Sequence, residues 1–135
     1  MRLFLDACVI IYQVEAAEPF YSRLARAVTS VRQAHGRLSW AVSRLSLMEC
    51  LVRPLREHDT ATLARYEEFF AARDLEIVEL TPRVVDTATR LRASYGTRTP
   101  DAIQAACALS LRGSTVFMTG DASFKKIEGL EVLVV

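Results

Sequence analysis

Four acidic residues stand out in this 135-residue chain because each borders or interrupts an apolar segment. Asp6 and Asp121 each follow an apolar run, Asp101 follows Thr99-Pro100, and Glu49 lies within an apolar stretch. A carboxylate in such a place is costly unless something compensates its charge. None of the four has a basic residue directly beside it, so we expect a shared compensator. Carboxylate oxygens are ligands that Mg²⁺ and Mn²⁺ prefer, and the pattern predicts such a metal site.

The elements that must position these acids alternate along the chain. Short apolar runs predict strands, the first of them buried on both faces as in a parallel sheet, at residues 2–5, 38–42, 75–80, 115–119 and 131–134. Helical periodicity, with Thr-Pro starts and glycine stops, predicts helices at 8–16, 19–36, about 44–54, 60–73, 82–95 and 102–111. This order predicts an α/β fold, a three-layer α/β/α sandwich with a mostly parallel central sheet of about five strands. We expect residues 1–135 to form a single domain.

Such a fold can bring the four acids together. Ligands of open α/β sheets bind beyond the carboxyl ends of strands, near the point where the strand order reverses. Asp6 and Asp121 follow strands, Asp101 falls in the first turn of a helix, and Glu49 lies near the start of the helix after the second strand. We therefore expect the four carboxylates to converge on one pocket at that edge, where a metal-activated water is the nucleophile. His35 and His58 are expected at the surface, away from this chemistry.

Each acid also has a purely structural explanation. Asp6 could cap the following helix, Glu49 could pair with Arg53 at i+4, Asp101 could favour a helix start, and Asp121 could begin a turn. Each explanation is reasonable for its own residue, but none accounts for the other three. The coincidence of all four favours a shared site.

Composition and charge narrow the function classes. The chain is 51% hydrophobic and 24% charged, as in a globular domain with a sizeable core, and its net charge of +1 does not indicate a nucleic-acid-binding protein. No apolar run is long enough to cross a membrane and the first one is broken by Asp6, so we expect a cytoplasmic protein. Three separated cysteines indicate neither a disulfide framework nor a zinc site.

The basic residues are mostly arginine, 15 of the 17. An arginine fork suits phosphate, although a compositional bias explains the excess as well. The candidates for contacts with an RNA backbone lie near the acidic segments and are Arg44, Arg53, Arg56 and Arg98. Alternatively, these side chains pair with acids or only solvate one face.

Several segments match a known family in order and spacing over nearly the whole chain. They are Leu5–Ile11, Ser46–Pro54, Arg98–Ala106, Phe117–Phe124 and Gly129–Val132. With these segments the sequence resembles the PIN-domain ribonucleases, and among them it is most similar to the VapC toxins of type II toxin–antitoxin modules.

The resemblance implies that Asp6, Glu49, Asp101 and Asp121 are the catalytic and metal-binding acids, with Thr119 as an auxiliary polar residue. It implies Mg²⁺- or Mn²⁺-dependent cleavage of RNA, a homodimer, and a small antitoxin that blocks the site. A pocket of four acids would attract a guanidinium, so we expect the antitoxin to insert an Arg or Lys.

Two positions depart from the family pattern. Cys8 stands where the family usually has Ser, Thr or Asn, and a thiol is a poorer hydrogen-bond partner for a metal-bound water. Gly120 stands where Asn is common, and a loop should tolerate it.

An antitoxin also needs an apolar groove, to which aromatic residues of the helices at 19–36 and 60–73 could contribute. Phe20, Tyr66 and Phe70 have the spacing of core residues. Tyr21 and Phe69 lie off the main apolar stripes and are therefore candidates for a partner or dimer surface.

Three other functions compete with ribonuclease. One is a PIN-like module that binds RNA or protein without cutting. Another is a phosphatase of the haloacid dehalogenase type, which needs a second Asp where this chain has Cys8 and a core lysine where it has only Lys125 and Lys126. A response-regulator receiver lacks its acidic pair after the first strand.

Overall fold

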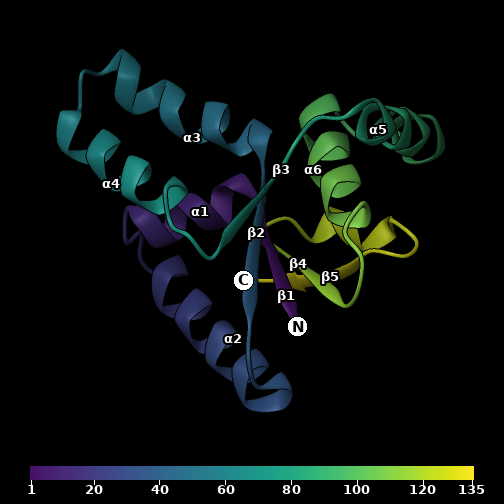
Figure 1. The fold of residues 1–135 in the computed structure, drawn as a ribbon, viewed down its shortest axis with the longest axis horizontal. Helices are drawn as coiled ribbons and strands as arrows, with labels where there is room; N and C mark the ends of the chain where they lie inside the picture. Colours follow the sequence, from purple (N-terminus) through teal and green to yellow (C-terminus); the bar gives the residue numbers. More distant parts are fainter.

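The computed structural model describes all 135 residues. Five strands alternate with six helices and one short 3₁₀ helix, in the order β1 (Arg2–Leu5), α1 (Ala7–Val14), α2 (Phe20–His35), β2 (Ser39–Ser43), α3 (Arg44–Arg56), α4 (Thr60–Phe70), β3 (Leu75–Val78), α5 (Pro82–Tyr95), α6 (Thr99–Leu109), β4 (Thr115–Thr119), η1 (Ala122–Lys126) and β5 (Glu131–Val134). The predicted α/β order is confirmed (Figure 1).

All five strands are parallel, where a mostly parallel sheet was expected. Their order is β3-β2-β1-β4-β5, with β1 hydrogen-bonded to β2 on one side and to β4 on the other. The chain builds the sheet from β1 outward through β2 to β3 and then crosses to β4 and β5. The strand order therefore reverses between β1 and β4, and the carboxyl ends of these two strands lie side by side.

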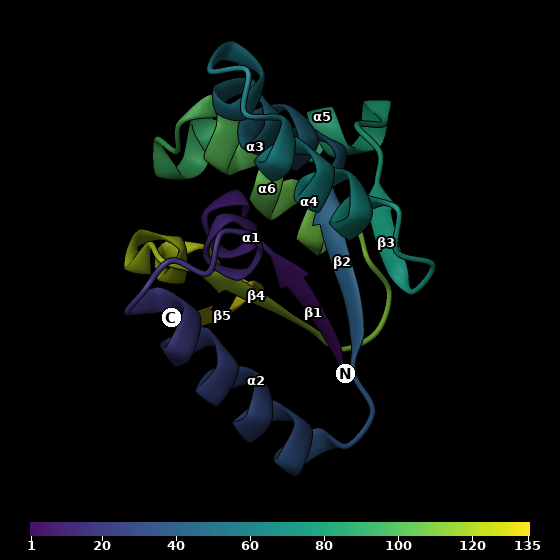
Figure 2. The ribbon, with the colours of Figure 1, turned by 90° about the vertical axis from the view of Figure 1, so that its left-hand side faces the viewer.

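Alternating side chains of the strands build two hydrophobic cores. In β1, Phe4 joins the core under α5 and α6, whereas Leu3 and Leu5 join the core under α1, α2 and α4. Figures 1 and 2 show the two groups of helices on opposite faces of the sheet. The three-layer sandwich is confirmed, and its first strand is buried on both faces.

Several element boundaries differ from the sequence-based expectation by one to three residues; α1, for example, ends at Val14 instead of residue 16, and α4 at Phe70 instead of residue 73. Two further differences involve proline. Pro54 lies inside α3, which continues to Arg56, because a proline removes only one backbone donor and the last turn of the helix tolerates that loss. At α6, Arg98 occupies the N-cap position that was expected for Thr99, and its side chain makes no capping hydrogen bond. Thr81 does cap α5, by accepting from the Val84 N–H.

None of the helices combines the length and the apolar composition that a membrane crossing requires.

Candidate functional site

Asp6 and Asp121 lie where the strand order reverses, joined by one threonine. Asp6 caps α1 directly after β1, and Asp121 caps η1 two residues after β4. The hydroxyl of Thr119, at the end of β4, donates to Asp6 Oδ2 over 2.7 Å and accepts from the Asp121 N–H over 3.1 Å. The position predicted for both acids at this edge is confirmed, and Thr119 is fully buried between them.

Asp6 is a buried carboxylate without a basic partner. Only 9% of the residue is exposed, and no ion pair reaches it. Burial raises the pKa of Asp6, while hydrogen bonds from Thr119 and from the Ala7 N–H lower it and the negative charge of Asp101 raises it. The charged form of Asp6 is therefore poorly compensated by the protein itself.

Glu49 lies on α3, and a buried amide holds it there. Gln104 of α6 is 1% exposed, and its Nε2 donates to Glu49 Oε1 over 2.8 Å and to Ser46 Oγ over 2.9 Å. Burial raises the pKa of Glu49, the Gln104 hydrogen bond lowers it, and the charges of Asp6 and Asp101 raise it. Sequence reasoning missed this role of Gln104. Its one available signal was a polar residue in an otherwise apolar helix.

Asp101 and Asp121 each have a different partner. Asp101 lies in the first turn of α6, as predicted, and Arg98 Nε approaches its Oδ2 at 3.4 Å. Asp121 is exposed and accepts from the Ser123 N–H over 2.8 Å, which lowers the pKa of Asp121. The positive charge of Arg98 also lowers the pKa of Glu49 and of Asp121. Arg98 therefore supplies part of the charge compensation that the sequence argument assigned to a shared metal ion.

The structure brings the acids into one electrostatic neighbourhood without assembling a coordination sphere. The charge of Asp101 raises the pKa of Asp6, and both charges raise the pKa of Glu49, but no three acidic, Cys or His side chains are grouped closely enough to hold a metal ion. The donors are all oxygen and fit Mg²⁺ or Mn²⁺ in kind. Holding an ion would require rotation of side chains that now have other partners.

Cys8 and Gly120 pack against this site together. The Cys8 thiol lies 3.7 Å from Asp6 Oδ2 and accepts from the Gly120 N–H over 3.4 Å, and burial raises the pKa of Cys8 to about 11. The thiol is therefore protonated at neutral pH. A Cβ at position 120 would lie 2.8 Å from the Tyr12 hydroxyl, so the glycine also fits a close contact.

The four arginines proposed to contact RNA differ in their partners. Arg44 pairs with Glu79, and Arg53 pairs with Glu15 and, over 3.0 Å, with Glu57. The alternative pairing of Glu49 with Arg53 is therefore wrong.

The remaining two are more available. Arg56 is exposed and makes no ion pair, and Arg98 contacts Asp101 through Nε alone. For Arg44 and Arg53 the structure favours the ion-pair alternative.

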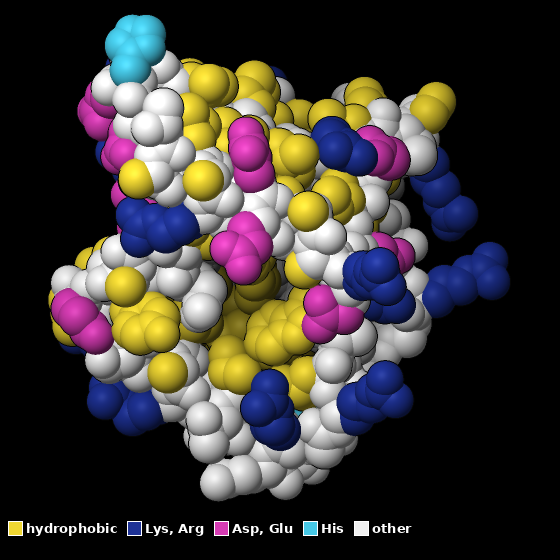
Figure 3. Space-filling view, turned by 60° about the vertical axis from the view of Figure 1, so that its left-hand side comes forward, with side chains coloured by type: hydrophobic (Ala, Val, Ile, Leu, Met, Phe, Trp, Pro, Cys, Tyr) yellow, Lys and Arg dark blue, Asp and Glu magenta, His cyan; other side chains and the backbone are white.

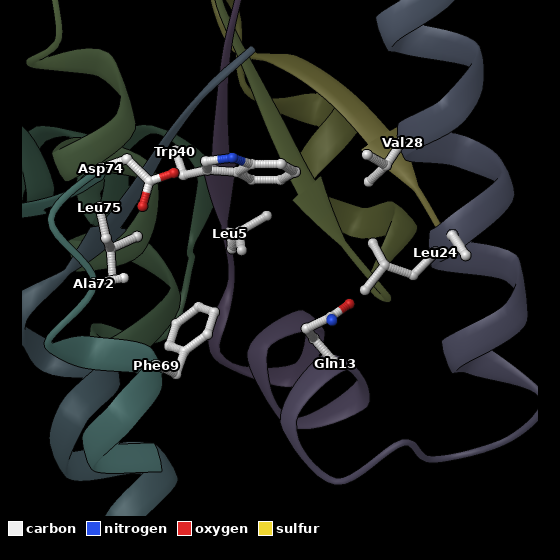
Figure 4. Close-up of a pocket in the computed structure, with 10 residues that line it drawn as sticks. Leu5, Gln13, Leu24, Val28, Trp40, Phe69, Ala72, Asp74 and Leu75 are labelled. Carbon is white, nitrogen blue, oxygen red and sulfur yellow. The ribbon is translucent and has the colours of Figure 1, made fainter. Parts of the chain in front are cut away.

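A separate apolar groove lies between α2 and α4. It encloses about 460 Å³ and is lined by Leu5, Gln13, Leu24, Ala25, Val28, Trp40, Phe69, Ala72, Asp74 and Leu75. Figure 3 shows it as a hydrophobic hollow with basic side chains below it and acidic ones above it and to its right. In Figure 4 Trp40 and Phe69 lie on one side of it, opposite Leu24 and Val28 of α2.

The aromatic residues divide between core, groove and surface. Tyr66 is fully buried and Phe69 lines the groove, while Tyr21 is 37% exposed.

A second apolar surface, on α3, was not predicted from the sequence. Met48, Val52 and Leu55 follow one another at helical spacing on α3 and are all more than half exposed.

Comparison with known proteins places these features in a family context. The family model described as PIN domain matches residues 3–130. No match was found among curated proteins. Among solved structures, VapBC2 from Rickettsia felis bound to a DNA fragment from its promoter matches at 16% identity, with a TM-score of 0.75, over 99% of this chain and 98% of the other.

Two further structures are similar over nearly their full length. A toxin–antitoxin complex from Klebsiella pneumoniae matches at 20% identity with a TM-score of 0.70, covering 98% of this chain and 96% of that chain. VapBC-5 from Mycobacterium tuberculosis matches at 24% identity with a TM-score of 0.61, covering 99% and 98%. At these identities the structures establish a shared fold.

Proposed function

This chain belongs to the PIN domain family, and we propose on that basis that it is a metal-dependent ribonuclease, the toxin of a toxin–antitoxin pair. The observation that carries the proposal is the group of Asp6, Thr119 and Asp121 at the point where the strand order reverses. Ligands of open α/β folds bind at this point. Glu49 and Asp101 add two carboxylates nearby: the charge of Asp101 raises the pKa of Asp6, and the charges of Asp6 and Asp101 raise that of Glu49.

Asp6, Glu49, Asp101 and Asp121 are the residues that would hold Mg²⁺ or Mn²⁺. The bound ion would lower the pKa of a water and offset charge on the phosphate. The protein contributes orientation, because Thr119 fixes Asp6 and Gln104 fixes Glu49 before any substrate arrives. Burial raises the pKa of Asp6, so a bound cation would favour its charged form, which supports a metal-binding role over a purely structural one.

The partner that we propose for the groove between α2 and α4 is an antitoxin segment. Eight of its ten lining residues are hydrophobic, which suits the apolar face of a peptide. The neighbouring α2 carries Arg23, Arg26 and Arg32 and no acid, whereas the charged residue of the lining itself is Asp74. A peptide with acidic residues toward α2 and away from Asp74 would therefore match. Toxin–antitoxin complexes among the structural relatives support this choice of occupant.

A homodimer is also part of the proposal. Phe69 lines the groove and is therefore less suitable as a dimer contact than the sequence suggested. Met48, Val52 and Leu55 offer an exposed apolar helix face for that contact instead. The inserted antitoxin Arg or Lys would approach the acids from outside the groove.

The alternative functions considered from the sequence are not equally supported. Membership of the PIN domain family contradicts the hypotheses that the chain is a haloacid dehalogenase-type phosphatase or a response-regulator receiver. A PIN module that binds without cutting remains the second candidate, favoured by the lack of three acids already grouped around one point.

The test is RNA cleavage by the purified chain in Mg²⁺ or Mn²⁺, with EDTA as the metal-free control. We expect cleavage by the wild type and none by Asp6→Asn, which removes one ligand charge at almost constant volume. Asp86→Asn is the matched control, because Asp86 is exposed on α5 and pairs only with Arg90. Metal-independent cleavage, or equal rates in wild type and Asp6→Asn, would contradict the proposal. RNA binding without cleavage would favour the non-cutting module.

A further inference from the structure

Arg98 is the one basic residue that forms an ion pair with any of the four acids. It precedes α6, and its charge reaches Glu49 and Asp121 as well as Asp101. The contact with Asp101 is long, at 3.4 Å, and the Arg98 side chain is 82% exposed. Such a pair is weak and easily opened.

The guanidinium of Arg98 is mostly unoccupied. Its Nε donates to Asp101, and neither of its Nη groups has a hydrogen-bond partner within the protein. Four N–H donors in a planar fork therefore face solvent beside the acidic edge. A planar fork of this kind matches two oxygens of a phosphate group. Arg53 differs, because both of its Nη groups already bind carboxylates.

We propose that Arg98 is a positioning residue with two partners, which holds Asp101 in the free protein and turns its fork to an RNA phosphate when substrate binds. The proposal rests on the proposed function for its substrate class. Arg98 competes with a metal ion for the Asp101 carboxylate, because a guanidinium and a divalent cation both neutralise the same charge. Transfer of Arg98 to a phosphate would free the Asp101 carboxylate to act as a ligand and would hold the phosphate near Asp101.

This arrangement predicts effects of opposite sign on two ligands. In Arg98→Gln, Mn²⁺ should bind about two- to fivefold tighter without RNA, the scale of an exposed ion pair. The same variant should bind a single-stranded RNA oligonucleotide more weakly, with a salt slope shallower by about 0.7. A residue with only a structural role would not move these two affinities in opposite directions.

The experiment uses the full chain and two readouts that do not depend on turnover. Calorimetry with Mn²⁺ gives metal affinity, and fluorescence anisotropy of a labelled oligonucleotide in Ca²⁺, at several salt concentrations, gives the RNA slope. Arg98→Lys keeps the charge without the fork, so it should keep wild-type Mn²⁺ affinity and lose RNA affinity. Arg90→Gln is the matched control, since Arg90 is exposed on α5 and pairs with Asp86 away from the site.

Each outcome decides the proposal. Tighter Mn²⁺ binding with a shallower RNA slope in Arg98→Gln supports it. An unchanged RNA slope, or unchanged or weaker Mn²⁺ binding, overturns it even if the wild type cleaves RNA. If the wild type itself does not bind RNA, the proposed function fails, and the Arg98 proposal fails with it.

Discussion

The acidic edge of the sheet and the apolar groove between α2 and α4 are built from different kinds of sequence signal. At the acidic edge, each residue stands out alone as a charge in or beside an apolar segment, and hydrogen bonds from Thr119 and Gln104 fix two of the carboxylates. In the groove, residues such as Leu24 and Trp40 look like ordinary core residues in the sequence, and only Phe69 was singled out as a partner candidate; together they line a hollow of about 460 Å³.

The difference shows which functional surfaces can be recognised from a sequence alone. A charged residue in an apolar segment can be recognised from the sequence, because the free-energy cost of burying it is suggested by its neighbours in the chain. The sequence does not distinguish an apolar residue of the core from one that lines an open groove, because whether another element covers it depends on the whole fold. The two regions should therefore respond separately to mutation, one through catalysis and the other through partner binding.

The largest difference between the effect on RNA cleavage and the effect on partner binding is expected for Glu49→Gln. Loss of this ligand charge should lower RNA cleavage by more than the roughly 100-fold upper end seen for outer-shell partners of metal sites. Binding of the product of the adjacent gene, the proposed antitoxin, should persist through the untouched groove and lose only the share that its inserted Arg or Lys contributes. Cleavage assays and calorimetry measure the two effects. Equal losses of cleavage and of complex formation would show that the two regions are not independent.

A smaller effect on the same region is expected for Gln104→Leu. The variant loses the donor that holds Glu49, so cleavage should fall about 10- to 100-fold. Because that hydrogen bond lowers the pKa of Glu49, its loss should also shift the acidic limb of the pH–rate profile upward. Thermal denaturation checks that the variant is folded. A rate loss with an unmoved acidic limb would mean that Gln104 acts by packing alone.

The groove is tested by Phe69→Ser. Truncation of a central aromatic anchor typically costs 2 kcal/mol or more, so antitoxin affinity should fall about 30-fold. The exposed Tyr21→Ser on α2 is the control and should change affinity little, since Tyr21 does not line the groove. Calorimetry with the adjacent gene product measures both, while RNA cleavage by the free chain should stay at the wild-type rate. A larger effect at Tyr21 would place the partner outside the groove.

The smallest effect concerns stability and pH. Burial raises the pKa of Asp6 above its ordinary 3.8, so the folded protein holds this proton more tightly than the unfolded chain does. The stabilising contribution is then complete below pH 3.8 and is lost as the pH rises through the folded-state value. Asp6→Asn should therefore gain stability relative to the wild type between pH 3.8 and neutral pH.

Urea denaturation in EDTA at several pH values measures this gain. Asp86→Asn controls for the loss of an exposed carboxyl, which should give no such pH-dependent gain. A stability difference that stays constant between Asp6→Asn and the wild type over this range would contradict the inference.

Much of the fold was readable from the sequence. The strand at residues 2–5 and that at 115–119 were predicted with the observed bounds, because continuous apolar runs leave few alternatives. Thr81 and Gly96 marked the ends of α5 through local hydrogen bonding and a left-handed φ. Helix ends that depend on more than local chemistry, as at Pro54 and Thr99, were misplaced.

The sequence by itself determined the four acids and the strands and helices that carry them, because charge in an apolar setting and helical or strand periodicity are local properties. Only the tertiary structure decided what each acid touches. Arg98 turned out to pair with Asp101, Gln104 to hold Glu49, and Arg53 to reach Glu15, 38 positions away. The Arg98 contact is local, three positions along the chain, and depends on where α6 begins. The Gln104 and Arg53 contacts are set by how the layers pack, because their side chains meet only when the sheet and its helices have formed.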